Sequence, residues 1–265
     1  MSELQKTFNT LQNKKEKALI PFFTCGYPAV GLFKDLIKVA ADSGADILEI
    51  GVPFSDPLAD GPSIQFSSNI ALKNRVNVQR SLEIIASIKK RVDLPLVVLT
   101  YANPIFQYGL EKFTKDAMAV GISGVVMADL VIEESKPIEE LFGRQGLDLI
   151  YLVAPTTNGS RLSAIARRSQ GFIYLVSVTG VTGVRRDIPA EVSAKIREIK
   201  RLTNKPVCVG FGISKPIQAK RIAQECEGII VGSALVDLIR RSRNKSEMLK
   251  KASRFLQSLK KAMEE

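Results

Sequence analysis

Short apolar runs alternate along the chain with longer segments in which apolar residues recur at helical spacing. Runs that are apolar on both faces are typical of parallel strands covered on both sides. There are eight of them, at residues 19–24, 47–51, 96–100, 124–128, 148–153, 172–177, 206–210 and 228–231. The segments between them, for example 32–41, 82–89 and 217–223, have the spacing of amphipathic helices. Eight alternations of strand and helix predict a (β/α)₈ barrel.

The two ends of the chain are expected to add helices to this barrel. Leu4, Phe8 and Leu11 would share one face of an N-terminal helix, which we expect to close the barrel floor. A terminal helix is expected over residues 246–263. No linker or low-complexity segment interrupts the pattern, so we expect a single barrel domain over residues 1–265.

Two of the eight units are longer than the others, those that follow the second and the sixth strand. The extra residues fall where loops open at the C-terminal ends of the strands, the face on which such barrels carry their active sites. Residues 177–187 combine glycines, small hydroxyl side chains and charges. This composition is typical of a lid that closes over a substrate.

Composition excludes several kinds of chemistry. The 265 residues include no histidine, which removes the usual general base and the commonest metal ligand. The three cysteines, Cys25, Cys208 and Cys226, lack metal-type spacing, so we expect neither a metal site nor a disulfide. The formal charge is +11, but the basic pairs are scattered over expected helices and no tryptophan is present. A nucleic-acid partner is therefore not expected.

The chain offers no signal for secretion or for a membrane. Residues 1–17 are polar and lysine-rich, and no apolar run approaches the ~20 residues of a membrane-spanning helix. We therefore expect a cytoplasmic protein that does not enter a membrane.

Two carboxylates mark the rim of the expected barrel. Glu49 lies between Leu48 and Ile50 in a buried strand, where an ionised side chain is costly unless it has a function or a partner. Asp60 lies in the loop that follows. Apolar neighbours would raise the pKa of Glu49, whereas a polar loop would leave Asp60 ionised. The pair is thus a candidate for acid/base catalysis.

Glycines after the last two strands indicate a phosphate site. Gly210 and Gly212 follow the seventh strand, and Gly232 and Ser233 follow the eighth. We expect each cluster to open a helix, and exposed N–H groups at a helix start favour a dianion. In the lid, Gly183 would add another N–H, and Thr182 would hydrogen-bond a carboxylate across the mouth.

Aromatic and apolar side chains near the strand ends would complete the pocket. Five residues are candidates for contact with an aromatic part of a substrate: Phe22, Leu99, Tyr101, Tyr174 and Phe211.

The segment EIGVPFSDPLADGP, residues 49–62, closely resembles the signature of the tryptophan synthase α chain family. Further blocks resemble the same family in the same order. They are FFTCGYP at 22–28, TYANPI at 100–105, ADL at 128–130, APTT at 154–157, SVTGVTG at 177–183 and GFGIS at 210–214. The resemblance covers the whole expected barrel.

The resemblance implies cleavage of indole-3-glycerol phosphate to indole and glyceraldehyde 3-phosphate by a retro-aldol reaction. Glu49 would protonate indole C3 and help to deprotonate the glycerol hydroxyl, and Asp60 would receive the indole N–H. The glycines and Ser233 would hold the phosphate, and Thr182 would close onto Asp60. The chain would need no cofactor. A β chain carrying pyridoxal phosphate would be its partner in an α₂β₂ complex.

Departures from the family pattern are few: Val131 where proline is common, Ala102 where many relatives carry tyrosine, and Cys25 in place of alanine. Alternative functions are a non-catalytic α-like chain that only activates a β chain, a free-standing indole-releasing lyase, and another phosphate-binding barrel such as indole-3-glycerol phosphate synthase or a sugar-phosphate isomerase. The synthase would need a lysine on an early strand, and residues 19–24 contain none.

Overall fold

The computed structural model describes residues 1–176, 189–210 and 212–264. Its strands form one sheet in the order β5-β4-β3-β2-β1-β9-β8-β7-β6, and every pairing is parallel. The strands are β1 Ala18–Thr24, β2 Leu48–Gly51, β3 Leu96–Thr100, β4 Gly124–Met127, β5 Asp148–Ile150, β6 Leu152–Val153, β7 Ile173–Val176, β8 Val207–Gly210 and β9 Gly228–Val231.

The sheet closes through β5 and β6, which are two parts of one barrel strand interrupted only at Tyr151. β5 pairs with β4, and β6 pairs with β7 on the other side. The nine strands thus occupy eight positions around the barrel. Each lies within two residues of a range expected from the apolar runs, and the predicted (β/α)₈ barrel is confirmed.

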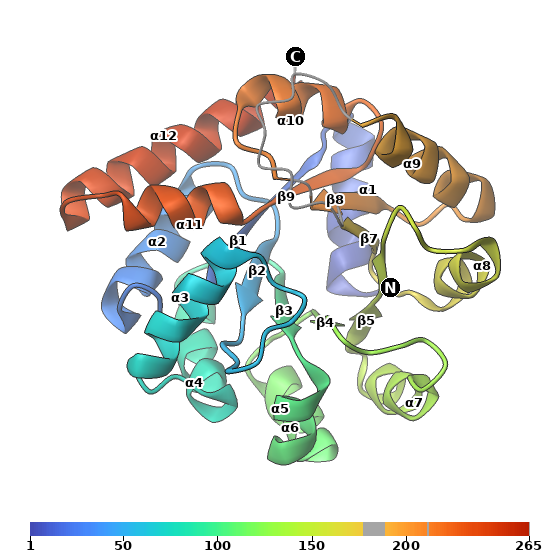
Figure 1. Ribbon diagram of the computed structural model, residues 1–265, viewed down its shortest axis with the longest axis horizontal. Coiled ribbons are helices and arrows are strands. Elements are labelled where there is room, and N and C mark those ends of the chain that lie inside the picture. Colours follow the sequence, from blue (N-terminus) through green and yellow to red (C-terminus); the bar gives the residue numbers. More distant parts are fainter. Residues whose placement is uncertain (177–188, 211, 265) are drawn as a thin grey trace.

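Helices surround the strands as a ring, which Figure 1 shows in a view along the barrel. The helices, including α1 below the ring, are α1 Glu3–Lys14, α2 Val30–Asp42, α3 Pro62–Lys73, α4 Val78–Lys89, α5 Ala102–Tyr108, α6 Leu110–Ala119, α7 Lys136–Gln145, α8 Gly159–Arg168, α9 Ala190–Leu202, α10 Pro216–Ala223, α11 Ser233–Arg240 and α12 Lys245–Glu264. The additional length after β2 holds two helices, α3 and α4.

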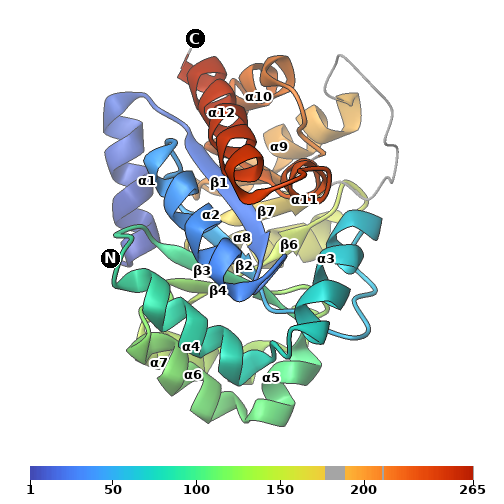
Figure 2. The ribbon, with the colours of Figure 1, turned by 90° about the vertical axis from the view of Figure 1, so that its left-hand side faces the viewer.

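The core has an outer and an inner part. Alternate strand residues point outward to the helices or inward into the barrel. Leu4, Phe8 and Leu11 of α1 pack into the inner cluster, together with Ile20 and Phe172 among others. The N-terminal helix therefore closes the barrel floor as predicted, and in Figure 2 it lies at the end of the barrel opposite α3.

One helix start differs from the sequence prediction. Gly232 is the N-cap of α11, as expected, but α10 begins at Pro216, beyond Gly210 and Gly212. Proline fixes φ near the helical value and needs no N–H partner at the first helical position, so it determines this start. Gly210 ends β8 and Gly212 lies in the loop before α10, so neither glycine is at a helix N-terminus.

Among the described residues, no helix combines the length and the apolar character that a membrane-spanning segment requires.

Candidate active site

A cavity of about 200 Å³ opens at the C-terminal ends of the strands. Eight of the residues singled out from the sequence line it: Phe22, Leu99, Asp60, Tyr174, Gly210, Gly212, Gly232 and Ser233. They come from strands β1, β3, β7 and β8, from the loops after β2 and β8, and from the start of α11. The barrel therefore brings together the carboxylate, the aromatic residues and the glycines that the sequence had indicated separately.

Glu49 lies beneath this cavity at the centre of the barrel. Its side chain is only 1% exposed, and its neighbours across the sheet are Phe22 on β1 and Val97 on β3. The Tyr174 hydroxyl donates to Oε2 at 3.4 Å, whereas Oε1 has no hydrogen-bond partner in the described part of the chain. Burial raises the pKa of Glu49 to about 8, more than the Tyr174 hydrogen bond lowers it. Glu49 is therefore mainly protonated at neutral pH.

Asp60 lies in the loop after β2, where a hydrogen bond from the Gln65 side chain to its backbone carbonyl, 2.9 Å, ties it to α3. We expected a polar surrounding that leaves the carboxylate ionised. Instead, burial raises the pKa of Asp60 to about 6, and a hydrogen bond from Tyr101 limits the rise. Because this value lies below that of Glu49, one carboxyl is protonated and the other mainly ionised at pH 7, which is how acid and base roles are divided.

Tyr101 was expected to touch a substrate, but it is not among the described residues that line the cavity. Its hydroxyl accepts a hydrogen bond from the Ala59 N–H at 3.0 Å, and its ring contacts Phe54 with the centroids 5.2 Å apart. Both contacts hold the loop that carries Asp60. Tyr101 therefore helps to hold Asp60 in place through contacts with its loop.

Two glycines make room for the aromatic side chains of the cavity. A Cβ atom at Gly51 would lie 2.5 Å from the Phe22 ring, and one at Gly210 would lie 2.6 Å from the Tyr174 ring. Real Cβ atoms do not approach other atoms so closely, so only glycine permits these ring positions. Gly210, which the sequence indicated for phosphate, thus also sets the position of the hydroxyl that faces Glu49.

The N-terminus of α11 is the candidate anion-binding element of the site. The N-cap Gly232 provides no side chain to bond the free N–H groups of the first turn. Ser233 is exposed and lines the cavity together with Ala234. The N–H groups at the start of a helix and the helix dipole favour a phosphate here. Gly212, with φ +34°, lines the same cavity from the loop before α10.

Three candidate residues lie outside the described residues: Thr182, Gly183 and Phe211. The expected lid, residues 177–187, lies outside them as well.

Sequence reasoning missed several apolar residues of the cavity: Ile64, Ala128, Leu152, Val176, Ile213 and Ile230. A signal for some of them was present. In a closed barrel, inward residues recur at every second position of each strand, so Val176 follows Tyr174 inward and Ile230 follows Gly228. Ile64 comes from α3, and no strand alternation points to it.

Among the residues that the structure describes, no group of three or more Cys, Asp or Glu side chains is arranged to hold a metal ion. Cys25, Cys208 and Cys226 are free thiols, and all three are buried.

The raised pKa of Glu49 predicts how stability depends on pH. A carboxyl whose pKa is higher in the folded state stabilises the fold most below its unfolded value of 4.5, and this contribution is lost as the pH rises to about 8. Relative to Glu49→Gln, the wild-type chain should therefore lose on the order of 3 kcal/mol of unfolding free energy between pH 5 and pH 8. Urea denaturation of both proteins at the two pH values measures this difference. Glu111→Gln, at an exposed position, is the control and should follow the wild type; equal behaviour of all three proteins would contradict the assignment.

The sequence is similar to one family of known proteins over nearly its whole length. The family model described as tryptophan synthase alpha chain matches residues 8–264. The chain is 44% identical to the tryptophan synthase alpha chain of Thermoanaerobacter sp. (strain X514), over 99% of this chain and 100% of that protein. It is 42% identical to the one from Geobacter sulfurreducens, over 99% of both chains.

Solved structures agree with this result. Tryptophan synthase subunit alpha from Legionella pneumophila superposes with a TM-score of 0.91 at 32% identity, covering 100% of this chain and 99% of that one. A chain of tryptophan synthase from M. tuberculosis gives a TM-score of 0.89 at 32% identity, with 99% of both chains covered. The resemblance of residues 49–62 thus extends over nearly the whole sequence and fold, and the chain belongs to the tryptophan synthase α chain family.

Proposed function

We propose that the chain is a lyase that cleaves indole-3-glycerol phosphate to indole and glyceraldehyde 3-phosphate, the α reaction of tryptophan synthase in L-tryptophan biosynthesis. The observation that carries the proposal is the division of charge between two carboxyls. Glu49 is buried, is mainly protonated at neutral pH and has one oxygen without a partner among the described residues, whereas Asp60 is mainly ionised at the wall of the cavity above it. The same cavity reaches the N-terminus of α11.

The reaction uses these groups in a closed proton cycle. Glu49 donates its proton to indole C3, and the positive charge that develops on the ring is stabilised by Asp60, which accepts the indole N–H. The bond between C3 and the side-chain carbon then breaks, and its electron pair returns to the ring. The hydroxyl on that carbon gives its proton to the Glu49 carboxylate and becomes the aldehyde oxygen. Indole and glyceraldehyde 3-phosphate leave, and the carboxyl is again protonated.

The remaining candidate residues serve substrate binding. Phe22, Leu99 and Tyr174 border the indole, and Phe211 is assigned to the same role. Tyr101 acts on the indole site through Asp60. Gly212, Gly232 and Ser233 hold the phosphate together with Gly183, and Thr182 closes onto Asp60. The N–H groups in the first turn of α11 supply the attraction for a dianion.

The rate of indole release tests this function. Indole-3-glycerol phosphate is incubated with the purified chain, alone and with a β chain, and both products are quantified. We expect indole and glyceraldehyde 3-phosphate in equal amounts, slowly with the chain alone and faster with the β chain. No product in either case, with the β chain nevertheless activated, would indicate the non-catalytic alternative. The intact pair Glu49 and Asp60 argues against that alternative.

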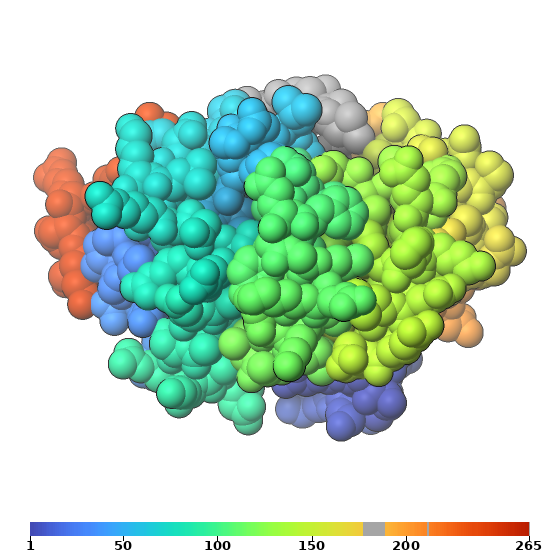
Figure 3. Space-filling view, turned by 90° about the horizontal axis from the view of Figure 1, so that it is seen from below, coloured from blue at the N-terminus to red at the C-terminus, as the bar shows by residue number. Residues whose placement is uncertain are grey.

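The β chain, which carries the pyridoxal phosphate, is proposed to dock on the rim formed by the segments after β2, β3 and β4. Each segment exposes one large apolar side chain: Leu58 is 94% exposed, Phe106 53% and Val131 42%. Because β2, β3 and β4 are consecutive in the sheet, the three segments are neighbours, and Figure 3 shows them side by side. Apolar side chains that gather at one rim are typical of a docking surface.

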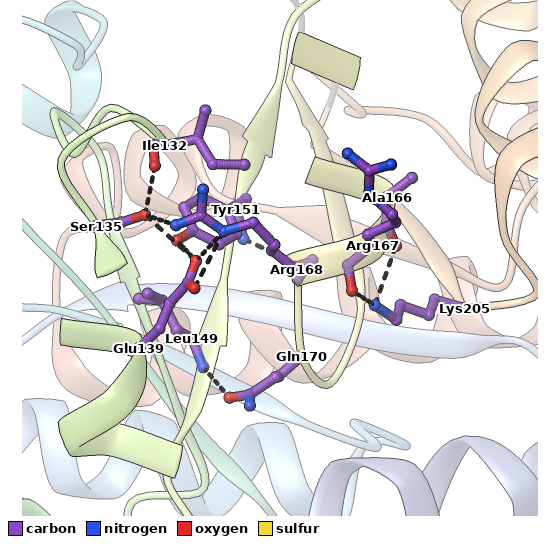
Figure 4. Close-up of polar contacts among 11 residues, drawn as sticks. Ile132, Ser135, Glu139, Leu149, Tyr151, Ala166, Arg167, Arg168, Gln170 and Lys205 are labelled. Carbon is purple, nitrogen blue, oxygen red and sulfur yellow. Dashed lines mark hydrogen bonds and ion pairs between the residues drawn. The ribbon is translucent and has the colours of Figure 1, made fainter. Parts of the chain in front are cut away.

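The segment that carries Val131 is anchored at its end by a network of polar contacts. Arg168 on α8 bonds Glu139 on α7 at 2.8 Å and the Ser135 hydroxyl at 2.8 Å (Figure 4). The Tyr151 hydroxyl also donates to Glu139. A fixed backbone costs less entropy when a partner binds, so this network favours docking at the rim.

Phe106→Ser should weaken the β chain's effect without changing the chain's own activity. Loss of a phenyl group from an interface costs on the order of 1.5–3 kcal/mol, which raises the β-chain concentration for half-maximal stimulation by about ten- to a hundredfold. Ile217 on α10 is similarly exposed, at 47%, but lies away from this rim. Ile217→Ser is the matched control and should stay within about twofold of the wild type. Equal effects of both substitutions would place the partner elsewhere.

Two further assignments accompany the function. A cytoplasmic location is proposed because the family serves amino-acid biosynthesis. A single domain over residues 1–265 is proposed because α1 packs into the barrel interior and α12 packs against α2 and α10.

A further inference from the structure

Two helices meet at the site from opposite sides of the proposed substrate. α3 begins at Pro62, directly after the loop that carries Asp60, and the Gln65 side chain bonds the Asp60 carbonyl. α11 begins at Ser233, next to the proposed phosphate position. The indole end of the substrate is thus tied to α3 and the phosphate end to α11.

The two helices are joined by a pair of side-chain contacts. The Ser63 hydroxyl donates to Oδ1 of Asp237 at 2.8 Å, and the Arg240 guanidinium lies 4.1 Å from the centroid of the Phe66 ring. Ser63 and Phe66 are three residues apart on α3, as are Asp237 and Arg240 on α11. Residues at this spacing share one helix face, so the contacts form a two-point connection between the helices.

The charges of Asp237 and Arg240 interact favourably with the dipoles of the two helices. Asp237 places a negative charge beside the first turn of α3, where the helix dipole is positive, and Arg240 lies in the last turn of α11, where it is negative. α3 has no side-chain N-cap of its own, because its N-cap is Gly61. The start of α3, and with it the loop of Asp60, is therefore held from α11.

We propose that Ser63 and Asp237 are positioning residues that couple phosphate binding at α11 to the placement of Asp60. A phosphate that orders the first turn of α11 would fix Asp237 one turn further along, and Asp237 would fix Ser63 three residues after Asp60. The inference rests on the proposed function and names a connection within that site. Neither residue is among those that line the cavity.

The test measures indole binding with and without saturating inorganic phosphate. The chain contains no tryptophan, so indole fluorescence reports binding directly. In the wild type, phosphate should tighten indole binding. Ser63→Ala and Asp237→Ala should each reduce that enhancement about threefold or more. The double variant should lose no more of the enhancement than either single variant does. The affinity of each variant for phosphate alone should stay within about twofold of the wild type. Ser63→Thr keeps the hydroxyl and should retain the enhancement.

The turnover of indole-3-glycerol phosphate provides the second readout. A displaced Asp60 stabilises the charge that develops on the ring less well, so kcat should fall by about tenfold while KM changes little. Ser63→Ala removes only one oxygen atom and should therefore fold. It provides the test by itself if Asp237→Ala does not fold. An unchanged enhancement in Ser63→Ala, or no enhancement in the wild type, would overturn the coupling. A wild type that binds neither indole nor phosphate would overturn the proposed function as well.

Discussion

Glu49→Gln is expected to abolish indole release, with a fall in kcat of roughly a thousandfold or more, because general acid–base catalysis contributes about 10²–10⁴ in rate and Glu49 serves twice in the cycle. Glutamine fills the same space and keeps an oxygen to accept from Tyr174, but it cannot give up a proton to C3. The fold and the affinity for phosphate should be unchanged. Initial rates of indole formation by the chain alone measure the effect.

Asp56→Asn is the control for this experiment. Asp56 is an exposed carboxylate in the same loop as Asp60 and is absent from the described lining of the cavity. Its amide variant should release indole within about threefold of the wild-type rate. If Glu49→Gln keeps more than about a tenth of the wild-type kcat, Glu49 is not the proton donor and the mechanism fails.

Gly232→Asp is expected to raise the KM for indole-3-glycerol phosphate by about a hundredfold or more. The new carboxylate would face the phosphate at the start of α11, and two like charges near 4 Å apart repel by about 1–4 kcal/mol, or more for a dianion. The added Cβ atom alone is tighter than usual but not prohibitive, since its nearest neighbour is the Phe22 ring at 3.3 Å. The loss should therefore come mainly from charge.

Two control variants show whether the rise in KM of Gly232→Asp comes from its charge, from its size or from a charge at any helix start. Gly232→Ala adds the Cβ atom without the charge and should lose much less affinity. Gly159→Asp places the same charge in the first turn of α8, where a Cβ atom meets nothing within 4 Å, and should leave KM unchanged. If Gly232→Asp binds substrate as tightly as Gly159→Asp does, the phosphate site lies elsewhere.

The barrel could be predicted because a strand that is buried on both faces has a short, continuous run of apolar residues. The runs at 96–100 and 228–231 match β3 and β9 residue for residue. Glu49 stood out because a carboxylate inside such a run is costly. These signals are local, so no long-range contact had to be known.

Other features depend on contacts between distant segments and could not be predicted. The burial that raises the pKa of Asp60 comes from the packed barrel mouth, while the local sequence is polar. Tyr101 was expected to contact the substrate, but its contact with the loop that carries Asp60 depends on the path of that loop after β2. The bond between Ser63 and Asp237 joins residues 174 positions apart, and neither residue type indicates it.

The measurement that tests the central claim most directly is cleavage of indole-3-glycerol phosphate in D₂O, with the indole product examined by mass spectrometry and NMR. If Glu49, exchanged with solvent, protonates C3, each indole formed should carry one deuteron at C3. Indole incubated with the chain without glyceraldehyde 3-phosphate gives the background exchange. Indole without deuterium at C3, or no indole at all, would contradict the account.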